Sequence, residues 1–221
     1  MGDRVAKEAL LAEFATVGKA LASPNRLELL DLLAQGPRSV EELARAAGLG
    51  LSTCSAHLQR LLAAGLVTTR RDGTRIWYSL AGDDVAALVA DLHAVAQRHR
   101  PHTEPARRNY VGPDDIEHVD LSDLLDQADA GAIVLLDVRP AQEYTAGHLP
   151  GAVHIPLDQL ADRIEELPAD RDVVAYCRGA YCALAHDAVR LLRAHGIPAR
   201  RATDGVLEWR AAGVPTLTGA T

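Results

Sequence analysis

A cysteine at the junction of a predicted strand and a predicted helix has the setting that most favours chemistry. The apolar run in 172–176 predicts a buried strand, and a helix is predicted to begin at Ala183. The loop between them should aim backbone N–H groups and the positive end of the helix dipole at the Cys177 sulfur, and we expect it to face solvent. This would lower the pKa of Cys177 and make it a catalytic thiolate. The residues predicted to bind an anionic substrate with it are Arg178, Gly179, Ala180, Tyr181 and Cys182.

A second set of residues has the pattern of a nucleic-acid reader. The segment 51–64 predicts a helix with Cys54, Leu58 and Leu61 on its inner face. Small hydroxyl residues begin its outer face, where they can approach base edges in a major groove. The DNA-contacting residues predicted on this helix are Ser52, Thr53, Ser55, His57, Gln59 and Arg60.

Two β-rich runs, 66–71 and 74–80, follow this helix. They are separated by Asp72-Gly73, the pair that a two-residue type I′ hairpin turn favours. Helix, turn, helix and hairpin in this order predict a helix-turn-helix with a wing. Arginines near the tip of the wing would contact phosphates, and they are Arg70, Arg71 and Arg75.

The remaining elements of the first half would support these sites. Ser39 and Glu42 form a capping-box pattern that opens one helix, and Gly48 stands where a left-handed C-cap is wanted. A first helix carries an apolar stripe over 10–21 and a fifth carries another over 85–95. These stripes have few partners within so small a domain, so we expect them to pair in a homodimer.

The second half alternates strand and helix patterns, which predicts a parallel sheet with helices on both faces. The segment 100–112 is rich in Pro, Arg and His without periodicity and is interpreted as a linker. The predicted strands are 133–137, 172–176 and 199–202, and the predicted helices are 157–167, 183–195 and 207–212.

Composition limits the class of protein. The 221 residues suggest two domains, and no apolar run approaches the length of a membrane span. We therefore expect a cytoplasmic protein without a membrane partner, whose three cysteines remain thiols. The net charge of −7 divides unevenly: residues 1–100 carry 12 basic against 11 acidic side chains, and residues 101–221 carry 11 against 19. The near-neutral first half suits DNA better than the acidic second half.

The first half resembles the ArsR family of winged-helix repressors over about residues 10–95. The motifs that carry the resemblance are ASPNRLELL at 22–30, GLGLSTCSAHL at 48–58, AGLV at 64–67 and the wing. The resemblance implies a homodimer on double-stranded operator DNA that is released when an effector reaches the protein. Gly50 and Cys54 depart from the family pattern of a serine N-cap and an aliphatic residue. The family's metal-binding Cys-x-Cys is absent from 39–48, and Asp91 and His93 match only half of its second site, so no metal is predicted.

The second half resembles a rhodanese domain over about residues 115–218. The motifs are LDVR at 136–139, EY at 143–144, GHLPGA at 147–152, the Cys177 loop and DGVLEW at 204–209. The resemblance implies transfer of sulfane sulfur from a small donor such as thiosulfate or a persulfide, through a persulfide on Cys177 and without a cofactor. Arg178 would neutralise the donor. The related Cys-x5-Arg phosphatases need an arginine where this chain has Ala183. A supporting ion-pair shell is predicted from Asp137, Arg139 and Glu143.

The predicted fold is therefore an α+β winged helix-turn-helix domain (1–99), a linker (100–113) and an α/β rhodanese domain (114–221). The predicted function is a transcriptional regulator that couples sulfane-sulfur or thiol-reactive signals to gene expression. One alternative is a sulfurtransferase whose winged helix serves only dimerisation or tethering. Another is an arsenic- or redox-responsive regulator that uses Cys177 and Cys182. Cys182 could close a disulfide with Cys177 or simply point into the domain.

Overall fold

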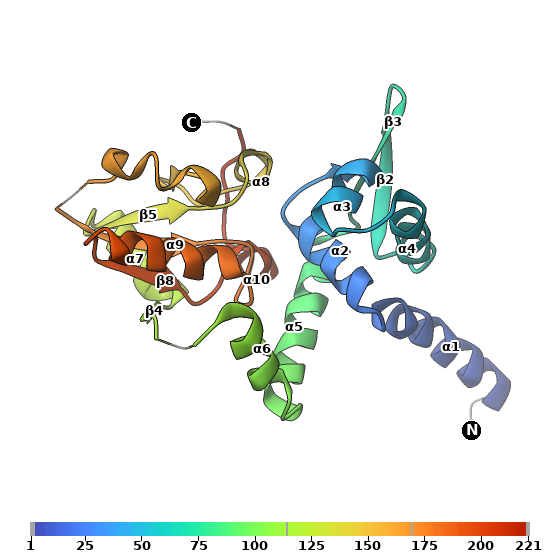
Figure 1. Cartoon of the computed structure of the whole chain (residues 1–221). Coiled ribbons are helices and arrows are strands. Elements are labelled where there is room, and N and C mark those ends of the chain that lie inside the picture. The colour runs from blue at the N-terminus through green and yellow to red at the C-terminus, as the bar shows by residue number, and fades with distance from the viewer. Residues whose placement is uncertain (1–2, 114, 169, 220–221) are drawn as a thin grey trace. The chain divides into compact units, whose positions relative to one another are not determined.

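The computed structural model describes residues 3–113, 115–168 and 170–219 and divides into two compact units, Met1–Val89 and Ala90–Thr221. Helix α5 (Asp83–His99) spans the division (Figure 1). Its early residues Val85, Ala86 and Val89 are buried, whereas its residues from Ala90 onward belong to the second unit. Each unit is described by itself below.

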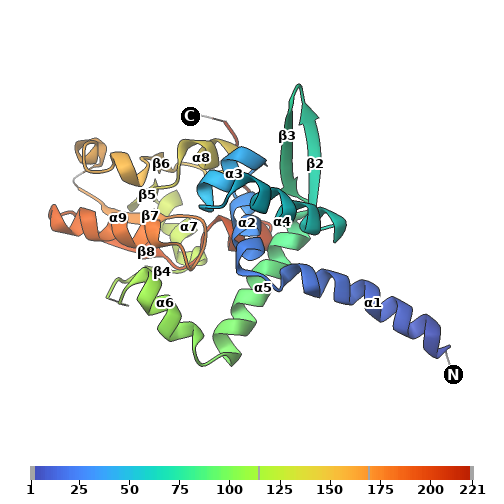
Figure 2. The same cartoon turned by 45° about the vertical axis from the view of Figure 1, so that its right-hand side comes forward.

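The first unit is a winged helix-turn-helix. Its antiparallel sheet has the strand order β1-β3-β2, and β2 and β3 form a hairpin that projects from the helices (Figure 2). Its elements before α5 are α1 (Arg4–Leu21), α2 (Pro24–Ala34), β1 (Arg38–Ser39), α3 (Val40–Ala46), α4 (Leu51–Ala63), β2 (Val67–Asp72) and β3 (Arg75–Leu80).

Local signals explain the helix-turn-helix. Ser39 caps α3 by accepting the Glu42 N–H, and the Glu42 side chain accepts the Ser39 N–H, which confirms the capping box. Gly48 has φ +62°, as the predicted left-handed cap requires. Cys54, Leu58 and Leu61 of α4 are fully buried, which leaves the opposite face of this helix to solvent.

The wing turn differs from the prediction. Asp72 pairs with Arg75, so the two loop residues are Gly73 and Thr74 and not Asp72-Gly73. Gly73 has φ +59°, and no described residue other than glycine has a positive φ. A type I′ turn needs positive φ at both loop positions, whereas glycine at the first position alone fits type II′. Only the first loop position therefore requires glycine.

Helix α1 projects from the rest of its unit (Figure 2). Only Ala20 of its residues is buried, and Leu10 and Phe14 are 56% and 63% exposed. The first part of the predicted apolar stripe, at Leu10 and Phe14, is therefore exposed within the unit, whereas Val17 and Leu21 are half-buried.

The second unit is built on a five-stranded sheet in which every described pairing is parallel. The strand order is β4-β8-β7-β5-β6, with β7 central. Its elements after α5 are α6 (Thr103–Val111), β4 (His118–Val119), α7 (Leu121–Asp129), β5 (Ile133–Asp137), α8 (Ala141–Ala146), β6 (Val153–His154), β7 (Asp172–Tyr176), α9 (Ala183–Ala194), β8 (Ala199–Ala202) and α10 (Val206–Ala211).

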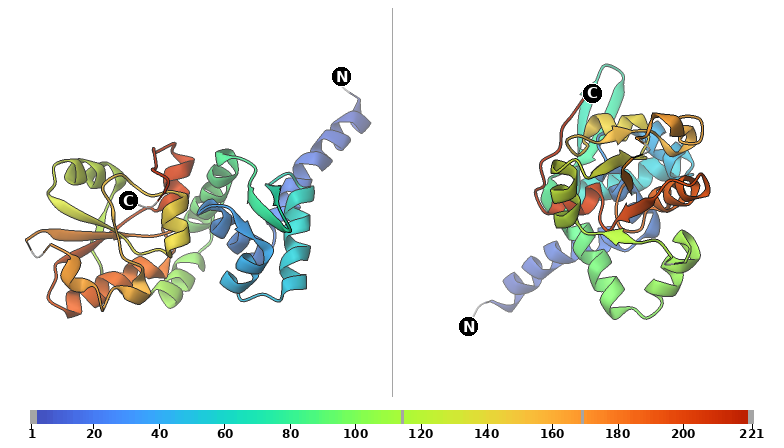
Figure 3. Two further views of the ribbon diagram at one scale, coloured as in Figure 1. Left: turned by 90° about the horizontal axis from the view of Figure 1, so that it is seen from above. Right: turned by 90° about the vertical axis from the view of Figure 1, so that its left-hand side faces the viewer.

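Helices cover both faces of this sheet (Figure 3). Alternate residues of β5 and β7 enter two separate cores, as the two-residue period of a strand requires. One core contains Val173, Cys177 and residues of α9. The other contains Val174 and Trp209, together with residues of α7, α8 and α10. The predicted parallel architecture is confirmed, and Cys177 lies on the α9 side.

One prediction for the second half is wrong. The expected helix at 157–167 is a pair of 3₁₀ helices, Leu157–Gln159 and Ile164–Glu166. Its start is tied to the end of β5, because the Leu157 N–H donates to the Val138 carbonyl, and Leu160 and Leu167 are buried in the same core. The tighter turns of 3₁₀ helices allow both the hydrogen bond at Leu157 and the burial of Leu160 and Leu167.

The segment interpreted as a linker contains helix α6. Glu104 pairs with Arg107 and with Arg108, each at 2.8 Å, at the spacings that place side chains together on a helix. Charge pairing therefore organises this helix in place of an apolar stripe.

Candidate functional site

Cys177 directly follows β7, and Cys182 is the N-cap residue of α9. Both are free thiols. Cys177 is 2% exposed, and its Sγ lies 3.5 Å from the Cys182 carbonyl oxygen, whereas Cys182 is only half-buried. The expectation of a solvent-facing Cys177 is wrong, because the thiol belongs to the core beneath α9.

The acid–base properties of the pair reverse the expectation for Cys177. Burial raises the pKa of Cys177 well above its usual value, and the neighbouring Cys182 adds to the rise, while the Ala185 backbone and the Arg201 charge oppose it. The hydrogen bond from Cys177 lowers the pKa of Cys182 to about 7, against the effect of burial, with help from the Arg178 and Leu184 backbone. The first proton lost by the pair therefore leaves a thiolate at Cys182.

The start of the segment 204–209 holds the loop in shape. The Val206 and Leu207 N–H groups donate to the carbonyls of Cys177 and Arg178 at 3.3 and 2.9 Å. A Cβ on residue 205 would overlap the Cys177 carbonyl and the Gly179 amide, so only glycine permits this approach. The rhodanese-like motif thus has a direct steric role.

Glu208 ties the same segment to the loop. It accepts the Ala180 N–H at 3.3 Å and the Gly205 N–H at 2.9 Å. No role was predicted for Glu208, although it lies in the motif at 204–209. The Ala180 N–H is therefore directed at a carboxylate and not at the sulfur.

The predicted supporting residues form two separate ion pairs. Asp137 and Arg139 are both fully buried, and the Arg139 Nε donates to Asp137 Oδ1 at 3.0 Å. Glu143 instead pairs with Arg178, whose Nε and Nη2 donate to the carboxylate at 2.7–3.1 Å. Burial alone would lower the pKa of Arg178, but the hydrogen bonds and charge of Glu143 outweigh it and raise the pKa. The positive charge of Arg178 is thus already balanced by Glu143. This weakens the expectation that Arg178 serves mainly to bind the anionic sulfur donor.

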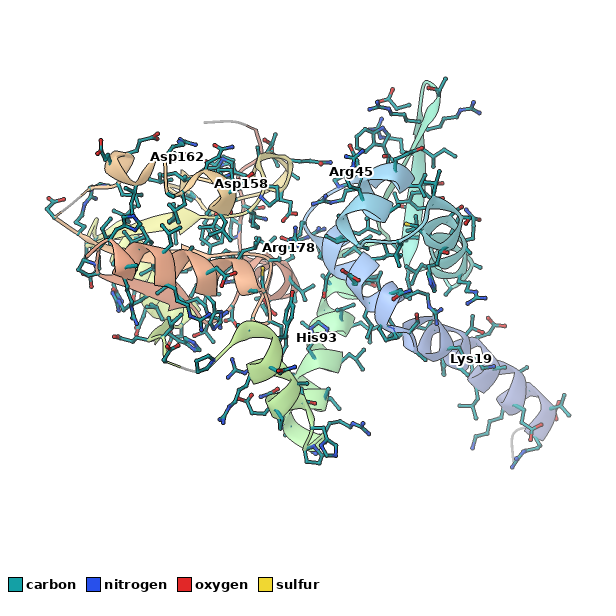
Figure 4. All side chains as sticks on the ribbon, viewed as in Figure 1. Lys19, Arg45, His93, Asp158, Asp162 and Arg178 are labelled. Carbon is teal, nitrogen blue, oxygen red and sulfur yellow. The ribbon has the colours of Figure 1, made fainter. Side chains whose placement is uncertain are left out.

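A cavity of about 390 Å³ lies beside Arg178 (Figure 4 labels Arg178 and Asp158). Apolar side chains dominate its walls, with Arg178 and Asp158 as the charged members. The lining residues are Val138, Pro140, Ala141, Pro156, Leu157, Asp158, Gln159, Arg178 and Leu184.

Tyr181 connects the loop to helix α5. Its hydroxyl donates to Gln97 Oε1 at 3.4 Å, and its ring meets that of His93 edge-on with centroids 5.5 Å apart (His93 is labelled in Figure 4). Gln97 also donates to Glu104 of α6 at 3.1 Å. No sequence pattern predicted this contact, because its partners lie more than 80 positions apart. His93, considered for half of a metal site, packs on Tyr181 instead.

The described residues contain no group of three or more His, Cys, Asp or Glu side chains that could hold a metal ion. Within the same ranges, no helix has both the length and the apolar character that crossing a membrane demands.

The predicted DNA-contacting residues of α4 are unequally available. Ser52, Thr53 and Arg60 are exposed, whereas Ser55 and His57 are half-buried. His57 Nε2 lies 3.3 Å from the Asn25 amide nitrogen. Gln59, although exposed, donates to the Tyr78 hydroxyl at 3.2 Å.

The wing arginines divide between the two faces of the hairpin. All three are exposed, but Arg70 and Arg75 share one face with Asp72, and Arg71 lies on the other. Arg70 approaches Asp72 at 3.5 Å, and the Arg71 Nε donates to the Gly73 carbonyl at 3.2 Å. One face of the wing therefore carries two of the three charges.

Each half of the chain matches a known protein family. A family model described as a helix-turn-helix domain matches residues 21–70, and one described as a rhodanese-like domain matches residues 120–212. The HTH-type transcriptional regulator Rv0324 of Mycobacterium tuberculosis is 52% identical over 215 residues, covering 97% of this chain and 94% of that protein. The chain belongs to this family of HTH-type transcriptional regulators. The predicted combination of a helix-turn-helix domain followed by a rhodanese domain is thereby confirmed.

Further relatives of the regulator match its first half. The HTH-type transcriptional regulator YgaV of Escherichia coli is 38% identical over 89 residues, covering 40% of this chain and 90% of that protein. A solved homodimeric winged helix-turn-helix DNA-binding domain from Mycobacterium bovis is 54% identical, covers 46% of this chain and 93% of that one, and has a TM-score of 0.42.

The thiol pair predicts an order of alkylation by iodoacetamide. Cys182 should react first, with a rate that rises through about pH 7 as its thiolate forms, whereas buried Cys177 should need a higher pH. Mass-spectrometric mapping of protein labelled briefly at a series of pH values measures both profiles. In Cys182→Ser the reaction near pH 7 should disappear, and labelling of Cys177 before Cys182 in the parent protein would contradict the assignment.

Proposed function

We propose that this regulator binds operator DNA as a homodimeric repressor and that its rhodanese domain forms a persulfide on Cys177, which changes operator affinity. The observation that carries the proposal is the Tyr181 contact with α5. The loop that starts with Cys177 meets a helix whose first residues are buried in the DNA-binding unit. A chemical change in the Cys177 loop would therefore reach the DNA-binding unit through helix α5. The proposed place of action is the cytoplasm.

The sulfur-transfer step would use both thiols. The Cys182 thiolate accepts the Cys177 proton, and the Cys177 thiolate attacks the outer sulfur of a donor such as thiosulfate. A new S–S bond forms on Cys177, the donor S–S bond breaks, and sulfite leaves with the electron pair. An organic persulfide would react in the same way, with a thiolate as the leaving group. The Cys182 pKa of about 7 suits a proton acceptor at neutral pH.

The cavity beside Arg178 is the proposed binding site for the donor. Its apolar walls suit the organic part of a persulfide, and its charged members Arg178 and Asp158 would orient polar groups. Because Cys177 is almost fully buried and is not among the lining residues, the loop must open for sulfur to reach it. That opening would disturb Tyr181.

Signal transfer would run from Tyr181 through α5. A persulfide adds one sulfur atom and a negative charge to a closely packed site, which the loop accommodates only by moving. Direct delivery of sulfur to Cys54 is a weaker route. Cys54 is fully buried, and burial raises its pKa, so it is a poor acceptor.

The homodimer is proposed from the apolar residues of α1. Leu10, Leu11 and Phe14 are each more than half exposed on a helix that packs little on its own unit. A second copy of the chain would bury them. Dimerisation would also present two recognition helices to two half-sites of an operator.

A second candidate is a regulator that responds to arsenic or another thiol-binding species, or to oxidation. The proximity of two free thiols favours it, since a soft ion or an oxidant could bridge Cys177 and Cys182. Release of operator DNA by arsenite without a sulfur donor would select this candidate. If the protein binds no DNA, the remaining candidate is a sulfurtransferase whose winged helix serves only dimerisation or tethering.

Incubation with thiosulfate should add one sulfur mass to the protein, measured by intact mass spectrometry and mapped to Cys177. Cys177→Ser should abolish the adduct, because its oxygen cannot form a persulfide. Cys54→Val is the matched control and should retain it. An adduct on Cys54 that persists in Cys177→Ser would exclude Cys177 as the acceptor.

Polysulfide treatment should lower operator affinity in the parent protein but not in Cys177→Ser, as measured by fluorescence anisotropy with labelled operator DNA. The double variant His93→Ala/Gln97→Ala should still take up sulfur and lose the affinity change, because the α5 side of the Tyr181 contact is removed. Exposed Arg98→Ala on the same helix is the control. Equal affinity of treated and untreated parent protein would make the rhodanese domain an enzyme that is merely delivered to DNA.

Substitutions on the two DNA-facing elements should separate affinity from specificity. Arg70→Ala or Arg75→Ala should weaken binding to all duplexes about equally and reduce the salt slope by ~1, since each removes a phosphate contact. Ser52→Ala or Thr53→Ala should change sequence preference instead. Titrations at several salt concentrations measure both effects. A protein that binds no duplex at low salt better than heparin would rule out the DNA-binding surface.

A further inference from the structure

Arg201 is a buried arginine directly beneath the Cys177 loop. It lies in β8, is 3% exposed, and shares the sheet face of α9 and Cys177. Its Nη1 donates to the Ala180 carbonyl at 3.1 Å, and its Nη2 donates to the Thr203 carbonyl at 3.4 Å. Its Nε is buried and has no hydrogen-bond partner among the described residues. The guanidinium is thus fixed to the loop.

The hydrogen-bond partners of Arg201 carry no opposite charge. Both acceptors are neutral carbonyls, and no carboxylate in the described ranges forms an ion pair with it. A buried charge requires an opposite charge nearby, or its desolvation is costly. Nearby Glu208 already accepts two backbone N–H groups, and burial raises its pKa.

The groups that could supply the opposite charge are the two thiols. Burial lowers the pKa of Arg201, whereas the charges of Cys177 and Cys182 raise it and so favour the charged form of the arginine. The other titratable groups that act on Arg201 are His186 of α9, Arg107 of α6, Glu208 of α10 and Asp204, and Arg178 acts on the two thiols. Burial raises the pKa of both acidic neighbours, Glu208 and Asp204, so a thiolate is the anion that we expect opposite Arg201.

We propose that Arg201 is a positioning residue that holds the Cys177 loop and supplies the positive charge for its anionic sulfur. Before transfer the anion is the thiolate of the Cys177–Cys182 pair. After transfer it is the terminal sulfur of the Cys177 persulfide. The inference of a charge on the thiol pair stands without sulfur transfer, and its extension to the persulfide rests on the proposed function. Arginine suits both tasks, because its planar fork reaches two carbonyls while its charge is retained.

Two substitutions separate the charge from the hydrogen bonds. Arg201→Lys keeps the charge and loses the fork, whereas Arg201→Gln keeps a donor for the Ala180 carbonyl and loses the charge. Arg200→Gln is the matched control, because Arg200 lies on the opposite face of β8 and contacts Gln127. The readout is the pH dependence of iodoacetamide labelling of Cys182 and Cys177 in the folded full-length protein, with folding checked by circular dichroism.

In Arg201→Gln the labelling profile of Cys182 should move up by about one pH unit, roughly a tenfold loss of thiolate near neutral pH. Arg201→Lys and Arg200→Gln should stay close to the parent. A folded Arg201→Gln with the parent profile would overturn the proposal. So would a folded Arg201→Lys that has lost the early labelling, because that result assigns the effect to the hydrogen bonds.

Thiosulfate uptake by the same variants separates this proposal from the proposed function. Alkylation needs no sulfur donor, so the Arg201 result is obtained even if the parent protein takes up no sulfur. A shifted labelling profile without any sulfur adduct in the parent would overturn the persulfide function and retain the charge role of Arg201. An adduct that forms equally fast in Arg201→Gln near neutral pH would remove Arg201 from the transfer step.

Discussion

The burial of the Cys177 thiol beneath α9 is the constraint that the surrounding residues of the second unit have to meet. A thiol as buried as Cys177 resists ionisation, because a charge removed from water must be matched by donors or by an opposite charge. The unit provides backbone groups of α9 at both sulfurs and the guanidinium of Arg201 below them. The parallel sheet makes this arrangement available, because the ends of β7 and β8 and the start of α9 meet at one edge.

The loop above this charge has little freedom of its own. The 204–209 segment holds it through two backbone hydrogen bonds and the Glu208 carboxylate, and Arg178 is clamped by Glu143. A loop fixed at so many points cannot absorb an additional atom locally. In the proposed function its displacement would be passed on to its contacts, one of which joins Tyr181 to α5. Rigidity at the reacting sulfur is therefore what would make a signal transmissible.

Patterns with a local physical cause were predictable from the sequence. The capping box at Ser39, the glycine at 48 and the strands at 133–137 and 172–176 depend on neighbouring residues alone. Helix α6 was missed because charge pairs stabilise it, whereas apolar periodicity was the criterion. The reversed acidity of Cys177 and Cys182 depends on burial by distant elements. The Arg200-Arg201 pair did contain a signal, because a two-residue period places adjacent arginines on opposite faces of a strand and both faces of this sheet are covered by helices.

The continuity of α5 makes the contact between His93 and Tyr181 dependent on the helical phase of the preceding residues. Val89 is buried in the first unit, and His93 one turn later meets Tyr181 in the second. At 3.6 residues per turn, an insertion of about four residues between them would restore the same face, whereas about two would turn His93 to the opposite side. Relatives that vary in length here and keep the ring contact with Tyr181 should therefore differ by whole helical turns.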